Sequence, residues 1–351
     1  MGNFSTLRVS AGMTQSQLAE LSGLRQATIS DLENGLTKPR AATVEKLAVA
    51  LQCSIHTVEE ALTKSRQEKA PQILNPVAAA SEWAFMSTLD KDLRKGLAEA
   101  LVSDWTHHST SLEGNTISAG DTLFIIREGL TISGNSLREH EEIHGHAQAV
   151  SIINHWLSSK TPITITQLHE LHRAVQTGAS VDIFAPVGEF KNESNGTMVI
   201  TTSGERKWHD YSHPRHTPAL MKEWLTSLKR ALQSPPLTHH ELVRVFTDLH
   251  LGFTGIHPYA DGNGRLARLL ANLPLLKAGQ PPLIIQAEAR TDYISLMGDY
   301  TIAHPASTPT SSLFFLGAER DRLEQFFLHQ WNHSLTLVQE FHDRQKNRES
   351  N

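Results

Sequence analysis

The sequence has 351 residues, of which 39% are hydrophobic and 20% charged, values typical of a globular protein with two or three domains. Its single cysteine, Cys53, excludes an internal disulfide framework and favours a reducing compartment. No run approaches the ~20 apolar residues of a membrane span, and residues 1–5 lack the features of a signal peptide. We therefore expect a cytoplasmic protein without membrane contact, and its net charge of −5 gives no global reason to expect nucleic-acid binding.

The first part of the chain nevertheless predicts three short helices. Thr14 and Gln17 have the spacing of a capping box that opens a helix with Leu18, Ala19 and Leu21 facing inward. A turn at Gly23 leads to a second helix from Arg25 to about Glu33, which Asn34-Gly35 ends. The third helix has an apolar face made of Val44, Leu47, Ala48 and Leu51.

This run, from about Leu7 to Leu62, resembles the Cro/repressor-type helix-turn-helix family. In that family the second helix enters the major groove of DNA by its N-terminal part. The resemblance implies that the DNA-binding residues are Arg25, Gln26, Ala27 and Ser30, with Gln15 bracing them or touching phosphate. Lys38 and Arg40 could reach the DNA backbone.

The local charge balance argues against strong DNA binding. Residues 1–70 contain eight Lys or Arg and seven Asp or Glu, a small excess for affinity that depends on phosphate contacts. The alternative is a helical bundle used for protein–protein contact. Reading a DNA operator would require a homodimer, because one short helix reads too few bases.

Polar residues interrupted by Pro71 and Pro76 follow this module. They predict a linker at residues 66–78, between a first domain at residues 1–65 and a second, mostly helical one at residues 79–345. Residues 346–351 should form a frayed tail. The fold class that follows is mainly α, with a small helix-turn-helix bundle ahead of a helical core.

Residues 109–115, Ser-Thr-Ser-Leu-Glu-Gly-Asn, predict the end of a short helix at about residues 105–116. Ser109 can cap this helix and Gly114 can end it, so that Glu113 projects from its last turn. By itself the pattern is common and weak.

Residues 140–144 read His-Glu-Glu-Ile-His, which satisfies the pattern of a zinc protease helix. The residues before them are largely polar, and no extended zinc signature follows. With 20 histidines in the chain, chance pairs of this spacing are expected. A solvated helix face is the favoured interpretation of His140 and His144.

Residues 197–202, Thr-Met-Val-Ile-Thr-Thr, form a β-branched run. The turn Ser203-Gly204 and a second extended stretch through Tyr211 follow, which predicts a β-hairpin in the otherwise helical chain. Such a hairpin could clamp a target segment by β-addition, or it could be an ordinary surface feature.

The most informative segment covers residues 257–268, His-Pro-Tyr-Ala-Asp-Gly-Asn-Gly-Arg-Leu-Ala-Arg. Apolar residues recur at helical spacing before and after it, so it should be a loop that opens onto a new helix, whose N-terminus is an anion site. Gly262 and Gly264 allow backbone N–H groups to curl around phosphate oxygens.

The side chains of this loop have complementary chemistry. His257 can act as a general base for an attacking hydroxyl, and Asp261 offers the oxygen ligand that Mg²⁺ prefers. Asn263 can donate to an α-phosphate oxygen. Arg265 and Arg268 can hold β- and γ-phosphates through bidentate contacts.

The same string resembles the signature of the Fic family, with Tyr259 in place of the usual Phe. The resemblance implies an all-helical Fic core with one β-hairpin flap. It also implies an enzyme, a protein adenylyltransferase, that uses Mg²⁺ and ATP to move AMP to a Ser, Thr or Tyr hydroxyl of a target protein or of itself. Tyr293 would then flank the adenine pocket, although packing on the core is the alternative.

Within this family, the pattern at Ser109 and Glu113 resembles the inhibitory helix. The resemblance implies that the Glu113 carboxylate occupies Arg268 and repels the γ-phosphate, so that ATP binds in an unproductive pose. Members with this glutamate can also remove AMP by hydrolysis. A transcription regulator controlled by nucleotide binding or by self-modification is the alternative from another functional class.

Overall fold

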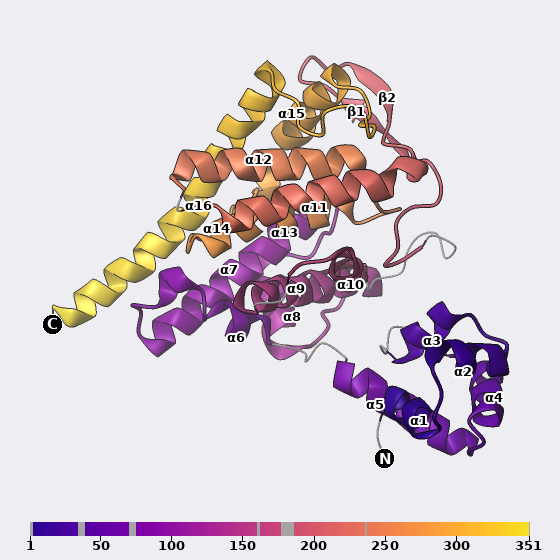
Figure 1. Cartoon of the computed structure of the whole chain (residues 1–351). Coiled ribbons are helices and arrows are strands. Elements are labelled where there is room, and N and C mark those ends of the chain that lie inside the picture. The colour runs from indigo at the N-terminus through magenta and orange to yellow at the C-terminus, as the bar shows by residue number, and fades with distance from the viewer. Residues whose placement is uncertain are drawn as a thin grey trace. The chain divides into compact units, whose positions relative to one another are not determined.

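The computed structural model describes residues 3–33, 39–69, 75–159, 162–176, 186–235 and 237–350, without the side chains of Ala27 and residues 66–69. The chain divides into two compact units, residues 1–74 and 75–351, and each is described here by itself (Figure 1). Among the described helices, none combines the length and apolar character that crossing a bilayer requires.

The first unit is a bundle of short helices: α1 (Phe4–Ser10), α2 (Gln15–Ser22), α3 (Gln26–Glu33), α4 (Ala41–Ala50) and α5 (Ile55–Lys69). The capping box is confirmed, since the Thr14 side chain accepts from the Gln17 backbone N–H and the Gln17 side chain accepts from the Thr14 N–H. Gly23 ends α2 in the left-handed conformation, with φ of 67°. The helix end predicted at Asn34-Gly35 lies outside the described residues.

The core of this unit forms around Leu18, Ile29, Leu47 and Val58, all essentially unexposed. One prediction was wrong: Leu21 is 62% exposed rather than inward. Leu21 lies three residues after the buried Leu18, but α2 has only eight residues and ends at Ser22. A helix this short buries only a narrow stripe of its surface, and Leu21 lies outside that stripe.

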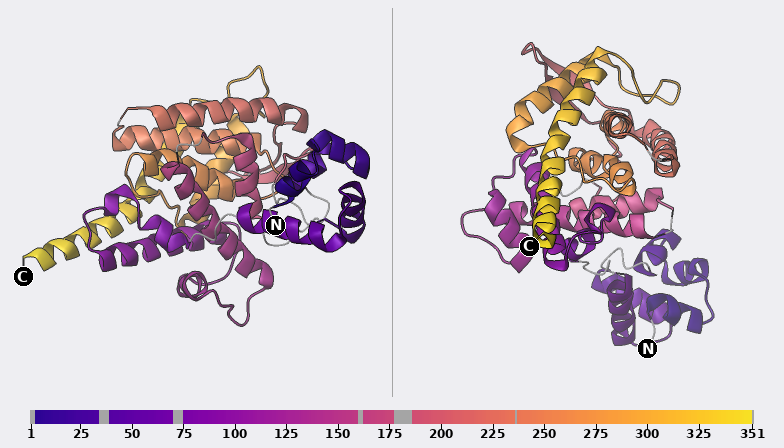
Figure 2. Two further views of the ribbon diagram at one scale, coloured as in Figure 1. Left: turned by 60° about the horizontal axis from the view of Figure 1, so that its bottom comes forward. Right: turned by 90° about the vertical axis from the view of Figure 1, so that its left-hand side faces the viewer.

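The second unit is built from helices that range from one turn to 32 residues. They are α6 (Pro76–Ala80), α7 (Lys91–Ser111), α8 (Ala119–Glu128), α9 (Leu137–Ser158), α10 (Ile165–Val175), α11 (Thr217–Gln233), α12 (His239–Ile256), α13 (Asn263–Ala271), α14 (Leu273–Lys277), α15 (Arg290–Ala303) and α16 (Ala318–Glu349). Two views at right angles show α16 as a long rod that crosses this unit, with its C-terminal end projecting (Figure 2).

The centre of the second unit lies around α12 and α13, which flank the loop singled out by its sequence. The apolar residues that recur at helical spacing before and after the loop are buried: Leu242, Leu249, Phe253, Ile256, Leu266, Leu269, Leu270 and Leu273. Val245 is only partly buried. Large aromatic side chains from α7, α11 and α16, namely Trp105, Trp224 and Trp331, fill the space around these helices. The loop therefore lies between two largely buried helices, which fix its ends.

The predicted hairpin is confirmed as an antiparallel pair of strands, β1 (Gly196–Ile200) and β2 (Arg206–Asp210), in which Met198 pairs with Trp208. Its turn is fastened to α15, because the backbone N–H and the hydroxyl of Thr202 both donate to the Asp299 carboxylate, at 2.9 and 2.7 Å. Gly298 of α15 lies so close to the backbone of Ile200 that a side chain would not fit. The hairpin is thus anchored at its turn.

One predicted boundary was wrong. Residues 346–350 do not form a frayed tail, since α16 is helical through Glu349. Arg348 donates to Asp92 at 2.7 Å, and Gln345 accepts from the Asp90 backbone N–H at 2.9 Å. These contacts with residues more than 250 positions away hold the end of the helix.

Candidate active site

The loop at residues 257–268 is shaped by two residues in the left-handed conformation. His257 ends α12 with φ of 51°, and Gly262 precedes α13 with φ of 75°. Between them, the Asn263 side chain accepts from the Tyr259 backbone N–H at 2.9 Å and donates to the Tyr259 carbonyl at 2.8 Å. Asn263, predicted to donate to an α-phosphate, is buried and is engaged in closing the loop.

Tyr259 anchors this loop to α10. Its ring is fully buried and stacks on His172, with centroids 4.0 Å apart. Its hydroxyl is 3.1 Å from the Nδ1 atom of His169. The hydroxyl that distinguishes this residue from the usual Phe therefore has a hydrogen-bond partner, so the substitution leaves no unsatisfied polar group.

His257 is held as a neutral imidazole at the edge of a cleft. Its ring stacks on Tyr211 with centroids 3.7 Å apart, and its Nδ1 atom lies 3.3 Å from the Thr254 carbonyl oxygen. Burial and the nearby Lys191 ammonium lower the pKa of His257 to about 3. With the proton on Nδ1 directed to a carbonyl, Nε2 is the atom that can accept a proton.

Lys191 was not assigned a role from the sequence, yet it lies directly behind this histidine. Its Nζ donates to the Asn195 side chain at 2.6 Å and to the Ile256 carbonyl at 3.2 Å. Burial lowers the pKa of Lys191 to about 8. Its backbone N–H donates to the Pro258 carbonyl at 2.9 Å, so this segment holds the chain on both sides of His257.

The cleft has a volume of about 410 Å³. His257, Gly264, Arg268 and Tyr293 line it together with Glu113 and with β1 residues 196–199. Asp261, Gly262, Asn263 and Arg265 are not among the described residues that line it. The structure thus brings the base, one arginine and the flap to one cavity, and places the Asp261 and Arg265 side chains against the end of α10.

Arg268 is the most completely engaged group of the site. Its Nε donates to the Ser109 hydroxyl at 3.0 Å, and its Nη2 donates to the Ser109 carbonyl at 2.8 Å and to the Glu113 carboxylate at 2.7 Å. The Arg268 side chain is 4% exposed, whereas that of Glu113 is 40% exposed. Removal from bulk water would raise the pKa of Glu113, but the charges of Arg268 and Arg265 hold it below its ordinary value.

This contact corrects one local prediction. Ser109 does not cap a short helix, because α7 begins at Lys91 and runs through Ser111. Ser109 is therefore in the last turn of a 21-residue helix, buried, with its hydroxyl directed to Arg268. Glu113 follows the end of α7 in a turn that Gly114 completes with φ of 103°, and its carboxylate lies against Gly264.

Asp261 has the properties of a ligand for a hard cation. It is exposed, with Oδ1 accepting from the Gly262 N–H at 2.6 Å and Oδ2 accepting from Gln176 Nε2 at 3.0 Å. The surrounding protein displaces part of its water, which would raise its pKa, but these hydrogen bonds and the charge of Arg265 lower the pKa, so the carboxylate is ionised at neutral pH. One ionised carboxylate completed by substrate phosphates and water suits Mg²⁺.

Arg265 is buried on the other side of the loop. Its guanidinium donates to the Val175 carbonyl at 3.2 Å and to Gln176 Oε1 at 3.1 Å. Its buried Nε has no partner among the described residues. Of the two arginines predicted to hold phosphates, only Arg268 reaches the cleft in this structure.

Tyr293 packs on the core, as the alternative interpretation from the sequence had it, and its place beside an adenine stays a prediction. It lines the cleft and is also packed against Phe326 and Phe327. Its hydroxyl is 3.0 Å from Nε2 of the buried His250.

The zinc interpretation of residues 140–144 does not fit the structure. The Nδ1 atom of His140 lies 2.8 Å from the Ser136 carbonyl, and Nε2 accepts from the Ile132 N–H at 3.0 Å. Both ring nitrogens are therefore occupied. No group of three His, Cys, Asp or Glu among the described residues could hold a metal ion. His140 is also buried rather than on a solvated helix face, because it ties the preceding loop to α9.

In the first unit, Arg25 immediately precedes α3, and both Arg25 and Gln26 are exposed. Ser30 is partly buried, and the Ala27 side chain lies outside the described residues, as does Lys38. Gln15 donates to Glu33 at 2.7 Å, and Arg8 pairs with the same carboxylate. Gln15 is thus engaged within the unit by Glu33, the last residue of α3, and its role beside DNA stays a prediction.

Comparisons with known proteins agree with both motifs. Residues 5–58 match a helix-turn-helix family model, and residues 162–275 match the model of the Fic/DOC family. Protein adenylyltransferase fic-1 of Caenorhabditis briggsae is 31% identical over 237 residues, which cover 62% of this chain and 43% of the relative. Protein adenylyltransferase Fic of Culex quinquefasciatus is 36% identical over 211 residues, covering 58% and 38%. The chain thus spans less than half the length of these relatives.

Solved structures show the same fold. A Fic-domain protein from Bacteroides thetaiotaomicron has a TM-score of 0.60 at 25% identity, covering 76% of this chain and 97% of that one. Fic-1 of Caenorhabditis elegans has a TM-score of 0.55 at 22% identity, covering 98% and 99%. The helical core with one hairpin, predicted from the sequence, is therefore confirmed.

Proposed function

We propose that this chain, whose residues 162–275 match the Fic/DOC family model, transfers AMP from ATP to a Ser, Thr or Tyr hydroxyl of a protein, either a target or itself. The observation that carries the proposal is the neutral His257 on the wall of the cleft, beside Gly264, Arg268 and the β1 strand. A base with a free Nε2 next to phosphate-binding groups is what hydroxyl activation requires.

In the proposed reaction, the hydroxyl oxygen attacks the α-phosphorus of ATP and its proton passes to Nε2 of His257. The new P–O bond forms as the bond to the β-phosphate oxygen breaks, and pyrophosphate leaves in line with the attack. Asp261 would hold Mg²⁺, which supplies charge neutralisation to the phosphates when bound. The N-terminal N–H groups of α13 would stabilise charge that builds on the α-phosphate.

We further propose that the chain is autoinhibited by Glu113. The ion pair with Arg268 supports this, because a guanidinium held by Ser109 and Glu113 is not available to a γ-phosphate. The carboxylate would also repel that phosphate across the cleft. The same carboxylate could orient a water molecule for hydrolytic removal of AMP, which keeps a de-AMPylating activity at the same site as the alternative.

The test incubates the Glu113→Gly chain with Mg²⁺ and with ATP labelled at either the α- or the γ-phosphate, and measures where each label goes. We expect label from α-labelled ATP to become covalently bound to protein, and label from γ-labelled ATP to be released as pyrophosphate. Protein labelling from γ-labelled ATP would identify a phosphoryl transferase instead. If neither label is transferred while ATP still binds, the proposal is overturned in favour of a nucleotide-sensing regulator.

A second proposed function, DNA binding by the first unit, is favoured by the helix-turn-helix match and by the exposed Arg25 and Gln26 at the start of α3. Arg and Gln can read guanine and adenine through bidentate bonds. A dimer would present two such helices to one operator.

We expect Gln26→Ala to weaken specific binding by about 1–3 kcal/mol, the range typical of one bidentate base contact. The measurement is fluorescence anisotropy with a duplex selected by the full chain from a random pool. Lys46→Ala, which removes an exposed cation of α4 outside the α3 start, is the control and should keep the sequence preference. Failure to select any sequence at low salt would leave the helical bundle as a protein-contact module.

A further inference from the structure

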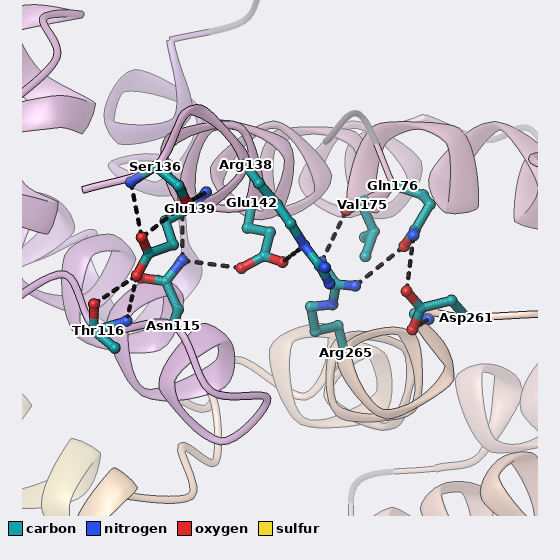
Figure 3. A network of polar contacts seen from close by, with 11 residues as sticks. Asn115, Thr116, Ser136, Arg138, Glu139, Glu142, Val175, Gln176, Asp261 and Arg265 are labelled. Atoms are coloured by element: carbon teal, nitrogen blue, oxygen red, sulfur yellow. Dashed lines mark hydrogen bonds and ion pairs between the residues drawn. The ribbon is translucent and has the colours of Figure 1, made fainter. Parts of the chain in front are cut away.

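One buried amide side chain joins two predicted site residues from outside the sequence motif. Gln176 follows the end of α10 and is 8% exposed. Its Oε1 accepts from Arg265 Nη2 at 3.1 Å, and its Nε2 donates to Asp261 Oδ2 at 3.0 Å (Figure 3). Figure 3 shows the amide lying between the guanidinium and the carboxylate, which come from the first turn of α13 and from the loop just before it.

The chemistry of these partners leaves the amide one orientation. A guanidinium only donates hydrogen bonds and an ionised carboxylate only accepts them, so Oε1 must face Arg265 and Nε2 must face Asp261. A glutamate would direct a second negative charge at Asp261, and a lysine would direct a positive charge at Arg265. A neutral amide of this length is therefore well suited to connect the two.

A further contact holds Arg265 in this arrangement. Its guanidinium also donates to the Val175 carbonyl at 3.2 Å. Arg265 is therefore held by two consecutive residues at the end of α10, Val175 and Gln176.

We infer that Gln176 is a positioning residue that sets the orientation of the Asp261 carboxylate for a divalent cation bound with ATP. The inference rests on the proposed function, in which Asp261 holds that cation. The Gly262 N–H holds Oδ1 and Gln176 holds Oδ2, so the carboxylate cannot rotate freely. The lone pairs that remain for a cation therefore point in a fixed direction. Outer partners of metal ligands act in this way, and their loss typically lowers metal affinity or activity by about 10–100-fold.

The experiment measures Mn²⁺ affinity by electron paramagnetic resonance, in the Glu113→Gly chain saturated with ATP. Gln176→Met keeps the length and removes both hydrogen bonds. We expect it to bind Mn²⁺ about 10-fold more weakly, with an unchanged ATP affinity in EDTA. A merely structural role would lower the metal-free ATP affinity and the melting temperature as well.

A matched control is Gln345→Met, which removes another amide that is 8% exposed and hydrogen-bonded at both ends, on α16. It should leave Mn²⁺ affinity unchanged. Gln176→Asn, one methylene shorter, cannot span both partners and should also weaken Mn²⁺ binding.

Equal Mn²⁺ affinity in the parent and both Gln176 variants would overturn the inference while leaving the proposed function intact. Loss of metal-free ATP binding in both Gln176 variants would overturn it in favour of a structural role. If the parent chain itself binds no Mn²⁺ with ATP, the assignment of Asp261 fails first, and the inference fails with it.

Discussion

Replacing His257 with alanine in the Glu113→Gly chain is expected to lower AMP transfer by about 10²–10⁴-fold, the usual contribution of a general base. The ATP affinity should stay the same, because His257 contacts Tyr211 and the Thr254 carbonyl rather than the arginine of the cleft. The measurement pairs covalent labelling from α-labelled ATP with ATP binding by calorimetry.

A matched variant separates catalysis from backbone strain. His257 has φ of 51°, a conformation that alanine adopts at some cost and that asparagine tolerates better. His257→Asn should therefore keep the fold and still lose transfer, because an amide is not a base near neutral pH. Substantial transfer by both variants would show that the proton goes elsewhere.

Replacing Glu113 with glycine is expected to raise AMP transfer by roughly 10–100-fold. A charge-assisted hydrogen bond contributes about 1.5–3 kcal/mol, and each 1.36 kcal/mol changes a rate tenfold. Without the carboxylate, Arg268 keeps its Ser109 contacts and gains a free Nη2 for the γ-phosphate. The measurement is the initial rate of labelling from α-labelled ATP, with the melting temperature of each chain recorded in parallel.

Two controls test the cause of this activation. Glu113→Gln keeps the size of the side chain and removes its charge, so it should activate in the same direction. Glu324→Gln breaks an ion pair with Arg320, which is not among the described residues that line the cleft, and should leave the rate unchanged. Equal rates for wild type and both Glu113 variants would contradict autoinhibition.

Gln176 and Lys191 show why part of the site escaped the sequence. Gln176 lies 85 positions from its partner Asp261, and the Lys191 ammonium meets the carbonyl next to His257 across 65 positions. No local pattern distinguishes either residue from an ordinary polar side chain. Only the packing of the end of α10 and of residues 191–195 against the loop gives them a role.

The sequence by itself determined the local structure, that is, the features that depend on residues only a few positions apart. The Thr14–Gln17 capping box, the hairpin at residues 196–210 and the helical periodicity on both sides of residues 257–268 were all correctly predicted. These features follow from hydrogen bonds and side-chain spacing within one or two turns.

The tertiary structure decided which residues meet. It extended α7 through Ser109, where a cap had been predicted, and brought that residue and Glu113 to Arg268 across more than 150 positions. It also engaged Asn263 within the loop and buried Arg265 behind it. Local patterns cannot predict such outcomes, because the free energy that selects them comes from burying side chains that are far apart in the chain.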